Sequence, residues 1–378
     1  VTGYIFAGIL LNPNLFNLLP ENFIVHTSLI TNISLSIITF SVGGTLVYSK
    51  IKKLGKGILI ITLLEAEFAF FVVLIGFLVA VSFLIHIPNA TWFTVFLPIS
   101  ILISSLASPT DPTATLAIIH ENKAKGDVAS TIMSVAAFDD VLGIVNYSLA
   151  IAIAGAFAFS SSFSFNTTIV TPLITIFGAV TLGGIFGLVL NSVTFIIKKN
   201  TEEAFIVYTM GLLLLCFGAA SKLGVDELLS TMVMGIVVVN FNPIGHRIFE
   251  ILEYHVEELI FVLFFTLSGM HLNFSVLANS YALVLLFVIF RAIGKILETM
   301  LGASISKSSP FIKKYTAGGL IPQGGIVIGL ALIIKQNHTF DNISDIIITI
   351  IIGATVINEL IGPILSRMTL KKAGEINI

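Results

Sequence analysis

The sequence predicts an all-helical, polytopic membrane protein with about twelve transmembrane segments. Of its 378 residues, 56% are hydrophobic and 11% are charged, whereas soluble domains carry about 25% charged residues. The mean hydropathy is +1.05. Apolar runs of about 20 residues recur along the chain, and each is long enough to cross a hydrocarbon core roughly 30 Å thick. We therefore expect residues 1–378 to form a single membrane domain.

Apolar runs separated by polar or basic loops define the expected segments. They cover residues 1–12, 24–47, 57–86, 94–119, 128–156, 168–197, 204–222, 226–240, 256–271, 276–303, 315–335 and 344–368. The first run is short for a span, and no Met or basic signal region opens the chain. We therefore expect one earlier helix, which gives about thirteen in all.

Two of the segments are interrupted. Residues 108–112, Ser-Pro-Thr-Asp-Pro, break the fourth, and residues 318–325, which include Pro322, Gln323 and Gly324, break the eleventh. Proline removes an amide donor and clashes with the preceding turn, so the freed backbone groups must line a cavity or be buried in protein. Interrupted segments in corresponding places of two halves indicate the binding site of a transporter.

Basic residues alternate between loops and predict the orientation. Most lie in loops that share one side of the membrane, which we name the basic face: Lys50, Lys52, Lys53, Lys56, Lys123, Lys125, Lys198, Lys199, Arg247, Lys307, Lys313, Lys314, Arg367, Lys371 and Lys372. The opposite face has only Lys222 and Lys335. Because cytoplasmic loops are enriched in Lys and Arg, we expect a plasma-membrane protein with a cytoplasmic C-terminus.

Several charged residues lie inside the expected spans, where each costs about 2.5–3.5 kcal/mol at a helix centre. Such a cost indicates a partner or a function. Asp139 and Asp140 are adjacent in the fifth segment, about 100° apart on a helix, so they need not face the same group. A carboxylate inside a membrane can hold a proton or a hard cation, but not both. That competition is the chemistry of a cation/proton exchanger, although either Asp could instead only pair with a buried base.

The fourth segment adds neutral oxygens and one acid at its break. Asp111 sits where a half-helix begins, so it offsets the positive end of the helix dipole or caps that helix. Thr110 and Thr113 offer hydroxyl and carbonyl oxygens of the kind sodium accepts. We therefore regard these three residues as accessories of an ion site.

Two bases share one face of the tenth segment, because Arg291 and Lys295 are four residues apart. Arginine stays charged and suits a permanent pair, for which Glu65 is the expected partner. Lysine can lose its proton when buried, so Lys295 is the expected proton-coupled partner of Asp139. The chain also carries Glu67, Glu298 and Glu359 within spans.

The order of these motifs resembles the cation:proton antiporter superfamily over nearly the whole chain. The residues that carry the resemblance are Thr110-Asp111-Pro112 in a broken fourth segment, Asp139-Asp140 in the fifth, Gly294-Lys295 in the tenth and the broken eleventh segment. The Asp-Asp pair is most similar to the electrogenic NhaA/NapA-type sodium/proton antiporters, because the electroneutral branch has Asn in place of the first Asp.

The resemblance implies inverted repeats whose broken helices cross at mid-membrane. It implies an ion-translocating core at about 57–156 and 276–368, and a dimerisation scaffold at about 1–47 and 168–240, in a homodimer. Carried over by position, Asp140 is the principal ion ligand and proton carrier, Asp139 pairs with Lys295, and Glu65 with Arg291 forms a structural salt bridge.

The functional hypothesis is a secondary active, electrogenic antiporter that exchanges Na⁺ (or Li⁺) for protons in pH homeostasis. Potassium/proton exchange is the alternative, and a passive channel uses similar groups. An intramembrane aspartyl protease would need Gly-X-Gly-Asp, whereas Asp140 follows Phe138-Asp139. No nucleotide motif is present, so we expect a gradient-driven transporter, not an enzyme. Its partners are monovalent cations, protons and the lipid bilayer, with no nucleic acid, no cofactor and no metal beyond the transported ion.

Overall fold

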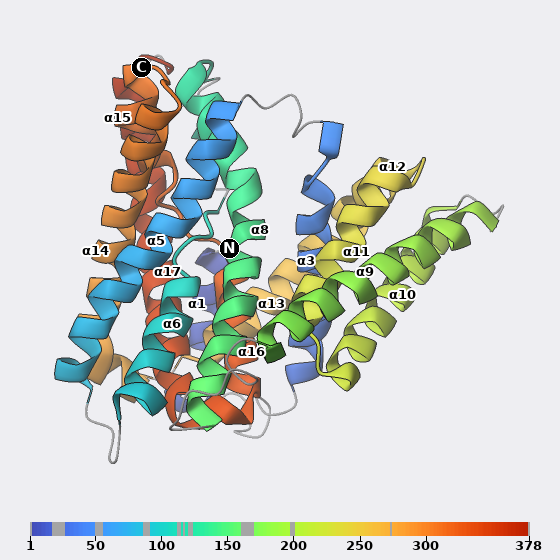
Figure 1. Cartoon of the computed structure of the whole chain (residues 1–378), viewed down its shortest axis with the longest axis horizontal. Coiled ribbons are helices and arrows are strands. Elements are labelled where there is room, and N and C mark those ends of the chain that lie inside the picture. The colour runs from blue at the N-terminus through green and yellow to red at the C-terminus, as the bar shows by residue number, and fades with distance from the viewer. Residues whose placement is uncertain are drawn as a thin grey trace.

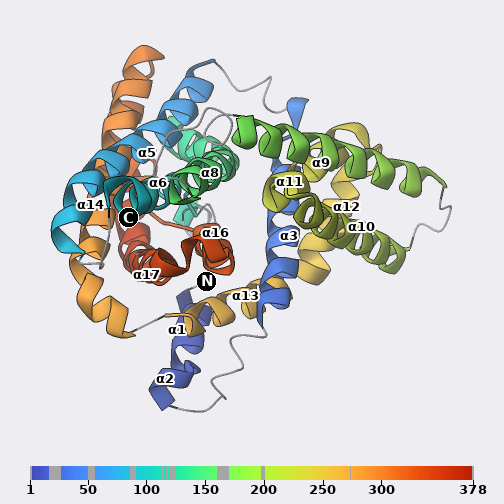
Figure 2. The ribbon, with the colours of Figure 1, turned by 60° about the horizontal axis from the view of Figure 1, so that its bottom comes forward.

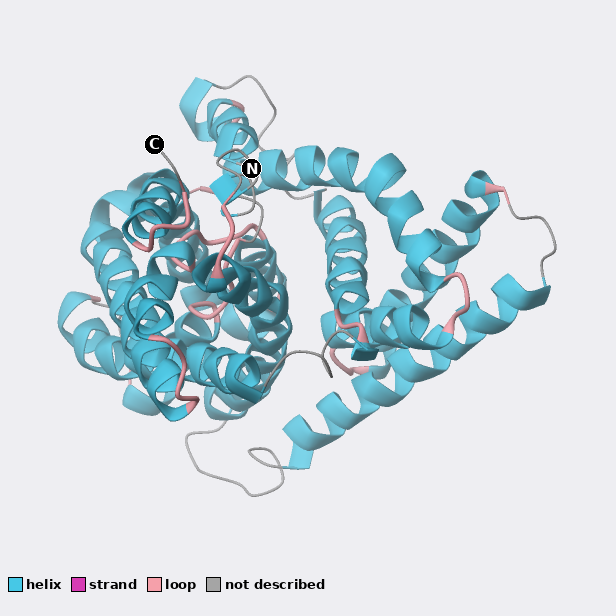
Figure 3. Cartoon of the chain, turned by 90° about the horizontal axis from the view of Figure 1, so that it is seen from above, coloured by secondary structure: helices cyan, strands magenta, loops and turns pink. Residues whose placement is uncertain are grey.

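The computed structural model describes residues 2–16, 27–49, 56–85, 91–111, 115, 118–119, 124–159, 170–196, 201–272 and 274–376. Within these ranges the chain forms helices and their connections, with no strand (Figure 3). The prediction of an all-helical chain is therefore confirmed for the described residues.

Each expected segment coincides with a helix or, for the eleventh, with a pair of helices across a break; for the fourth, only the half before the break is described as a helix, α6. The helices are α1 (Thr2–Leu10), α3 (Ser28–Thr45), α5 (Lys56–Leu84), α6 (Leu97–Ser105), α8 (Asp127–Phe159), α9 (Thr171–Ile196), α10 (Glu202–Leu223), α11 (Glu227–Phe241), α13 (Glu258–Met270), α14 (Phe274–Ile305), α15 (Pro310–Gly319), α16 (Ile326–Gln336) and α17 (Asp341–Lys372), with the short α2 (Pro13–Phe16) and α12 (Gly245–Leu252) between them. By length and composition, 7 of the described helices can cross a membrane alone.

Local sequence signals set where these helices begin and end. Before α10, the Thr201 side chain accepts a hydrogen bond from the amide of Ala204, and after it Gly224 adopts a left-handed conformation with φ 68°. Asp226 then caps α11 by accepting from the amide of Leu229 at 2.7 Å. Capping side chains satisfy amides that have no partner within the helix, so the turn between α10 and α11 is fixed by its own sequence.

The helices form two groups (Figures 1 and 2). One group contains α5, α6, α8 and α14 to α17, and the other contains α3 and α9 to α13. Within the first group α5 lies along α14 so closely that a Cβ on Gly294 would meet Ala69 Cα at 2.8 Å. Within the second, a Cβ on Gly235 of α11 would meet Phe40 O of α3 at 2.2 Å. Glycine permits both close approaches.

The two breaks cross one another inside the first group. The first follows α6 at Ser105 and the second separates α15 from α16. The amide of Asp111 donates to the carbonyl of Pro322 at 3.0 Å, and the Thr110 hydroxyl donates to the carbonyl of Leu320 at 3.3 Å. The freed backbone groups of each break are thus satisfied partly by the other, as buried polar groups in a membrane require. The inverted-repeat relation and the domain roles remain predictions.

Candidate functional site

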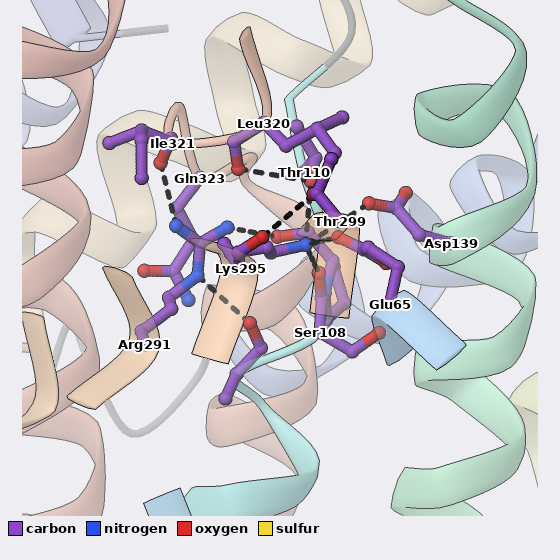
Figure 4. A network of polar contacts seen from close by, with 12 residues as sticks. Glu65, Ser108, Thr110, Asp139, Arg291, Lys295, Thr299, Leu320, Ile321 and Gln323 are labelled. Atoms are coloured by element: carbon purple, nitrogen blue, oxygen red, sulfur yellow. Dashed lines mark hydrogen bonds and ion pairs between the residues drawn. The ribbon is translucent and has the colours of Figure 1, made fainter. Parts of the chain in front are cut away.

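Arg291 on α14 holds the two breaks together. Its Nε donates to Ala107 O at 2.9 Å and its Nη2 to Pro109 O at 2.8 Å, both in the first break. Its Nη1 donates to Ile321 O at 2.6 Å in the second break (Figure 4). The side chain is 1% exposed. The charged fork therefore binds carbonyl dipoles from both irregular segments.

Lys295, one turn further along α14, binds acids instead. Its Nζ donates to Glu65 Oε1 on α5 and lies 3.5 Å from Asp139 Oδ2 on α8. It also donates to Thr110 Oγ1 at 3.0 Å and to the carbonyl of Ser108 (Figure 4). Both of its acid partners are completely buried. One ammonium group thus contacts two carboxylates and two residues of the first break.

The expected pairing of Glu65 with Arg291 is wrong: Glu65 pairs with Lys295. The register of α5 against α14 explains this, because Gly294 lies on Ala69 and Gly302 on Ile61, so the helices run in opposite directions. Glu65 therefore lies on the Lys295 side of the Gly294 contact, and Arg291 lies beyond it. The expected contact of Asp139 with Lys295 is present, but it is shared with Glu65.

Asp140 points away from this buried network. It lines a cavity of about 660 Å³ with Thr110, Asp111 and Gly324. The cavity extends to Glu253, which follows α12 at the end of the molecule where the C-terminus also lies (Figure 1). Within the described part of the chain, Asp140 Oδ1 has no hydrogen-bond partner. Adjacent acids on α8 therefore have different surroundings, one beside a buried base and one beside a cavity.

The remaining predicted site residues lie in or next to the breaks, apart from Thr113, which falls outside the described residues. Gln323 donates to Leu106 O at 2.9 Å and accepts from Asn358 Nδ2 of α17 at 2.7 Å. Pro322 packs against α17, since a Cβ on Gly362 would meet its ring at 2.7 Å. These side chains tie the breaks to their neighbours and do not line the cavity.

Sequence reasoning left some site residues without a role. Glu298 is completely buried one turn beyond Lys295. Its spacing of three residues from Lys295 was a usable signal. The Ser108 carbonyl carried no such signal, because a backbone acceptor shows nothing of its partner in the sequence.

Comparison with known proteins identifies the family. The model described as "Sodium/hydrogen exchanger, transmembrane" matches residues 1–372. The chain belongs to the sodium/hydrogen exchanger family. The predicted membership of the cation:proton antiporter superfamily is therefore confirmed, and the family consists of transporters, not enzymes. The NhaA/NapA subtype remains a prediction.

Several relatives are similar to this sodium/hydrogen exchanger family member. Cation/H(+) antiporter 18 of Arabidopsis thaliana is 23% identical over 89% of this chain and 42% of its own length. The Na(+)/H(+) antiporter NhaP of Pseudomonas aeruginosa is 25% identical over 71% of this chain and 66% of its own length. The chain thus spans less than half the length of that plant relative.

Among solved structures, the sodium proton antiporter MjNhaP1 of Methanocaldococcus jannaschii has the same fold. The TM-score is 0.75 at 21% identity, and the match covers 98% of this chain and 91% of that one. The likeness supports the arrangement of helices described above.

Proposed function

We propose that this exchanger exchanges Na⁺ for protons by alternating access, with Asp140 as the carrier. One observation carries the proposal: a cavity leads from the end of the molecule near α12 to Asp140, while Asp139 is buried beside Lys295. Among the described residues, Asp140 Oδ1 has no hydrogen-bond partner. A carboxylate placed this way is available to a cation or to a proton, and occupancy by one excludes the other.

The breaks supply the rest of the proposed ion site. Thr110 and Asp111 line the same cavity as Asp140, and hydroxyl, carbonyl and carboxylate oxygens are ligands that hard cations prefer. Arg291 donates to backbone carbonyls of both breaks, and Lys295 donates to the Thr110 hydroxyl, so the segments that carry these oxygens are held in place. Movement of the group that contains α8 and α14 against the group that contains α3 and α11 would then expose Asp140 to the other side.

The charge moved per cycle depends on Lys295. If the cation draws Asp139 away and Lys295 releases its proton, two protons exchange for one cation, which makes the cycle electrogenic. One net charge per cycle couples transport to the membrane potential by about 2.3 kcal/mol per 100 mV. Glu65 opposes this release because it stays beside the ammonium group. A rate independent of voltage would show that Glu65 keeps the proton on Lys295.

Transport in proteoliposomes tests the assignment. Asp140→Asn removes the charge without changing the size of the side chain, and we expect coupled exchange to be lost. Glu257→Gln is the matched control, because Glu257 lines the same cavity but lies outside the proposed ion site. Retained exchange in Asp140→Asn would contradict the proposal. Parallel assays driven by Na⁺, Li⁺ and K⁺ distinguish sodium from potassium exchange.

We also propose a homodimer in the plasma membrane, with α17 ending in the cytoplasm. The orientation rests on the basic face, to which Lys371 and Lys372 at the end of α17 belong. The dimer contact is expected on the group that contains α9 and α10, as the resemblance implies. Molecular mass in detergent and protease access to a C-terminal tag in sealed vesicles test the two statements.

A further inference from the structure

A second cavity lies at the opposite end of the interface between the two helix groups. It has a volume of about 290 Å³ and is lined by Asn32 of α3, Tyr147 of α8, Gln336 at the end of α16, and Asp226 and Glu227 at the start of α11. Most of its polar lining is oxygen-bearing, and two of its residues are carboxylates. The cavity therefore has the composition of a cation site, at a place to which the transport proposal assigns no residue.

Helices α3, α8 and α16 line both cavities, from opposite ends. On α8, Asp140 lines the first and Tyr147 the second, and a separation of seven residues keeps them on one helical face. Between them Ile144 is completely buried, as is Leu35 of α3. Buried apolar side chains thus lie between the two cavities on both α8 and α3.

Two oxygens in the second cavity have no partner. The Tyr147 hydroxyl is buried, with the side chain 1% exposed, and neither it nor Asn32 Oδ1 makes a hydrogen bond with the residues that the structure describes. A buried polar group without a partner costs about 1–3 kcal/mol. Both residues line the cavity, so a bound cation would satisfy them.

The charge of the cavity favours a cation. The positive end of α11 amounts to about half an elementary charge, and Asp226 Oδ1 already accepts from the amide of Leu229. Two carboxylates outweigh that half-charge. Lys335, in the last turn of α16, pairs with Asp345 at 3.1 Å. The volume is many times the roughly 10–15 Å³ that a cavity needs to hold one water molecule, so a cation bound here retains part of its hydration shell.

We propose that this second cavity is a binding site for a partly hydrated monovalent cation, held by Asp226 and Glu227 and by the oxygens of Tyr147 and Asn32. Only the role of the site in transport rests on the proposed function. In that role, the site holds the cation that enters or leaves at the face opposite the first cavity. Binding itself requires only the cavity.

Binding is measured in the Asp140→Asn variant, which removes the carboxylate of the first site. The thermal midpoint in detergent is followed against Na⁺ concentration, with an organic cation keeping the ionic strength constant. We expect a saturable rise in the midpoint. Adding Asp226→Asn, in which Asn still caps α11, or Tyr147→Phe should raise the half-saturating Na⁺ concentration about threefold.

Asp341→Asn is the matched control, because Asp341 begins α17 on the same face of the molecule, outside the cavity, and its side chain is 62% exposed. It should leave half-saturation unchanged. A midpoint without a saturable response in Asp140→Asn overturns the proposal. An equal shift in Asp341→Asn also overturns it, because the effect would then be one of surface charge.

Sided transport separates this proposal from the proposed function. In proteoliposomes oriented by protease access to a tag after α17, Asp226→Asn should raise the apparent KM about threefold for Na⁺ supplied at the face opposite α12, and leave it unchanged at the other face. If no variant or wild type exchanges cations but the midpoint response persists, the transport proposal fails and the second site stands. If exchange occurs without the midpoint response, the second site fails.

Discussion

The two broken-helix units make the same contacts with different residues. In the first, Pro109 lies against Gly143 of α8, where an added Cβ would be 2.4 Å from the proline ring. In the second, Pro322 lies against Gly362 of α17, where an added Cβ would be 2.7 Å from the ring and 2.8 Å from the backbone. Each break is thus seated on a glycine of the long helix that follows it.

The residues just before these glycines differ in charge. Asp139 and Asp140 precede Gly143 by four and three positions, and Asn358 and Glu359 precede Gly362 by the same numbers. Asn358 donates a hydrogen bond to Gln323, whereas Asp140 lines the first cavity. In our proposal this one arrangement of backbone serves two purposes: the first unit carries the exchangeable charge on Asp140, and the second joins its break to α17 through Asn358.

Loss of Arg291 is expected to have the largest effect, because this side chain joins the two units. Arg291→Met leaves the carbonyls of Ala107, Pro109 and Ile321 buried without their donor. We expect the free energy of unfolding to fall by about 3–5 kcal/mol, as when other buried charged contacts are broken. A lower thermal midpoint in detergent would show this. Arg291→Lys keeps the charge without the fork and should recover only part of it. Full recovery would show that charge alone holds the breaks.

The two glycines give a direct comparison of the units. The Cβ that Gly362→Ala adds would clash with the backbone of Pro322, which cannot move aside as the end of a flexible side chain can. We expect this variant to lower the free energy of unfolding by about 2–3 kcal/mol. The Cβ that Gly143→Ala adds would clash with the ring of Pro109, and we expect the free energy of unfolding to fall by about 1 kcal/mol. Thermal midpoints of the two variants measure this difference. The reverse order would mean that the first break is the more rigid of the two.

Glu65→Gln tests the charge assignment within the first unit. Lys295 would lose its nearest carboxylate but keep Asp139 and Thr110. We expect kcat for exchange to fall about tenfold, equivalent to about 1.4 kcal/mol, with KM nearly unchanged because Asp140 is untouched. Glu67→Gln, two residues along α5, serves as control. A raised KM with unchanged kcat would place Glu65 in the ion site itself.

Glu359→Gln is expected to have the smallest effect. Glu359 occupies the position in α17 that corresponds to Asp140, but it does not line the first cavity. We expect the exchange rate to stay within about twofold of wild type. The initial rate in proteoliposomes measures this. A loss as complete as that expected for Asp140→Asn would show that both units carry exchangeable charge.

Much of the fold could be predicted from the sequence, because lipid imposes a strong pattern. The need for long apolar helices revealed each segment, and the cost of proline in a helix revealed both breaks. Asp140 and Lys295 were identifiable because charge in a span requires a reason. These inferences rest on local composition, which a single sequence contains.

The pairing of the charges could not be predicted in full. Arg291 and Lys295 share a face, and which of them meets Glu65 depends on the register of α5 against α14, which Gly294 and Ala69 set by close contact. Arg291 binds only backbone carbonyls among its hydrogen-bond partners, and every residue offers one. The second cavity was likewise hidden, because Asn32, Tyr147 and Asp226 come from three separate helices.

The hydrogen bond from the Asp111 amide to Pro322 O has a consequence for hydrogen exchange. Irregular backbone usually exchanges its amide protons quickly, through small local openings. Here that amide can open only if the two crossing segments separate, and Arg291 binds both of them. The Asp111 amide should therefore exchange as slowly as the interior of α14, which makes two stretches without helix part of the slowest-opening unit of the protein.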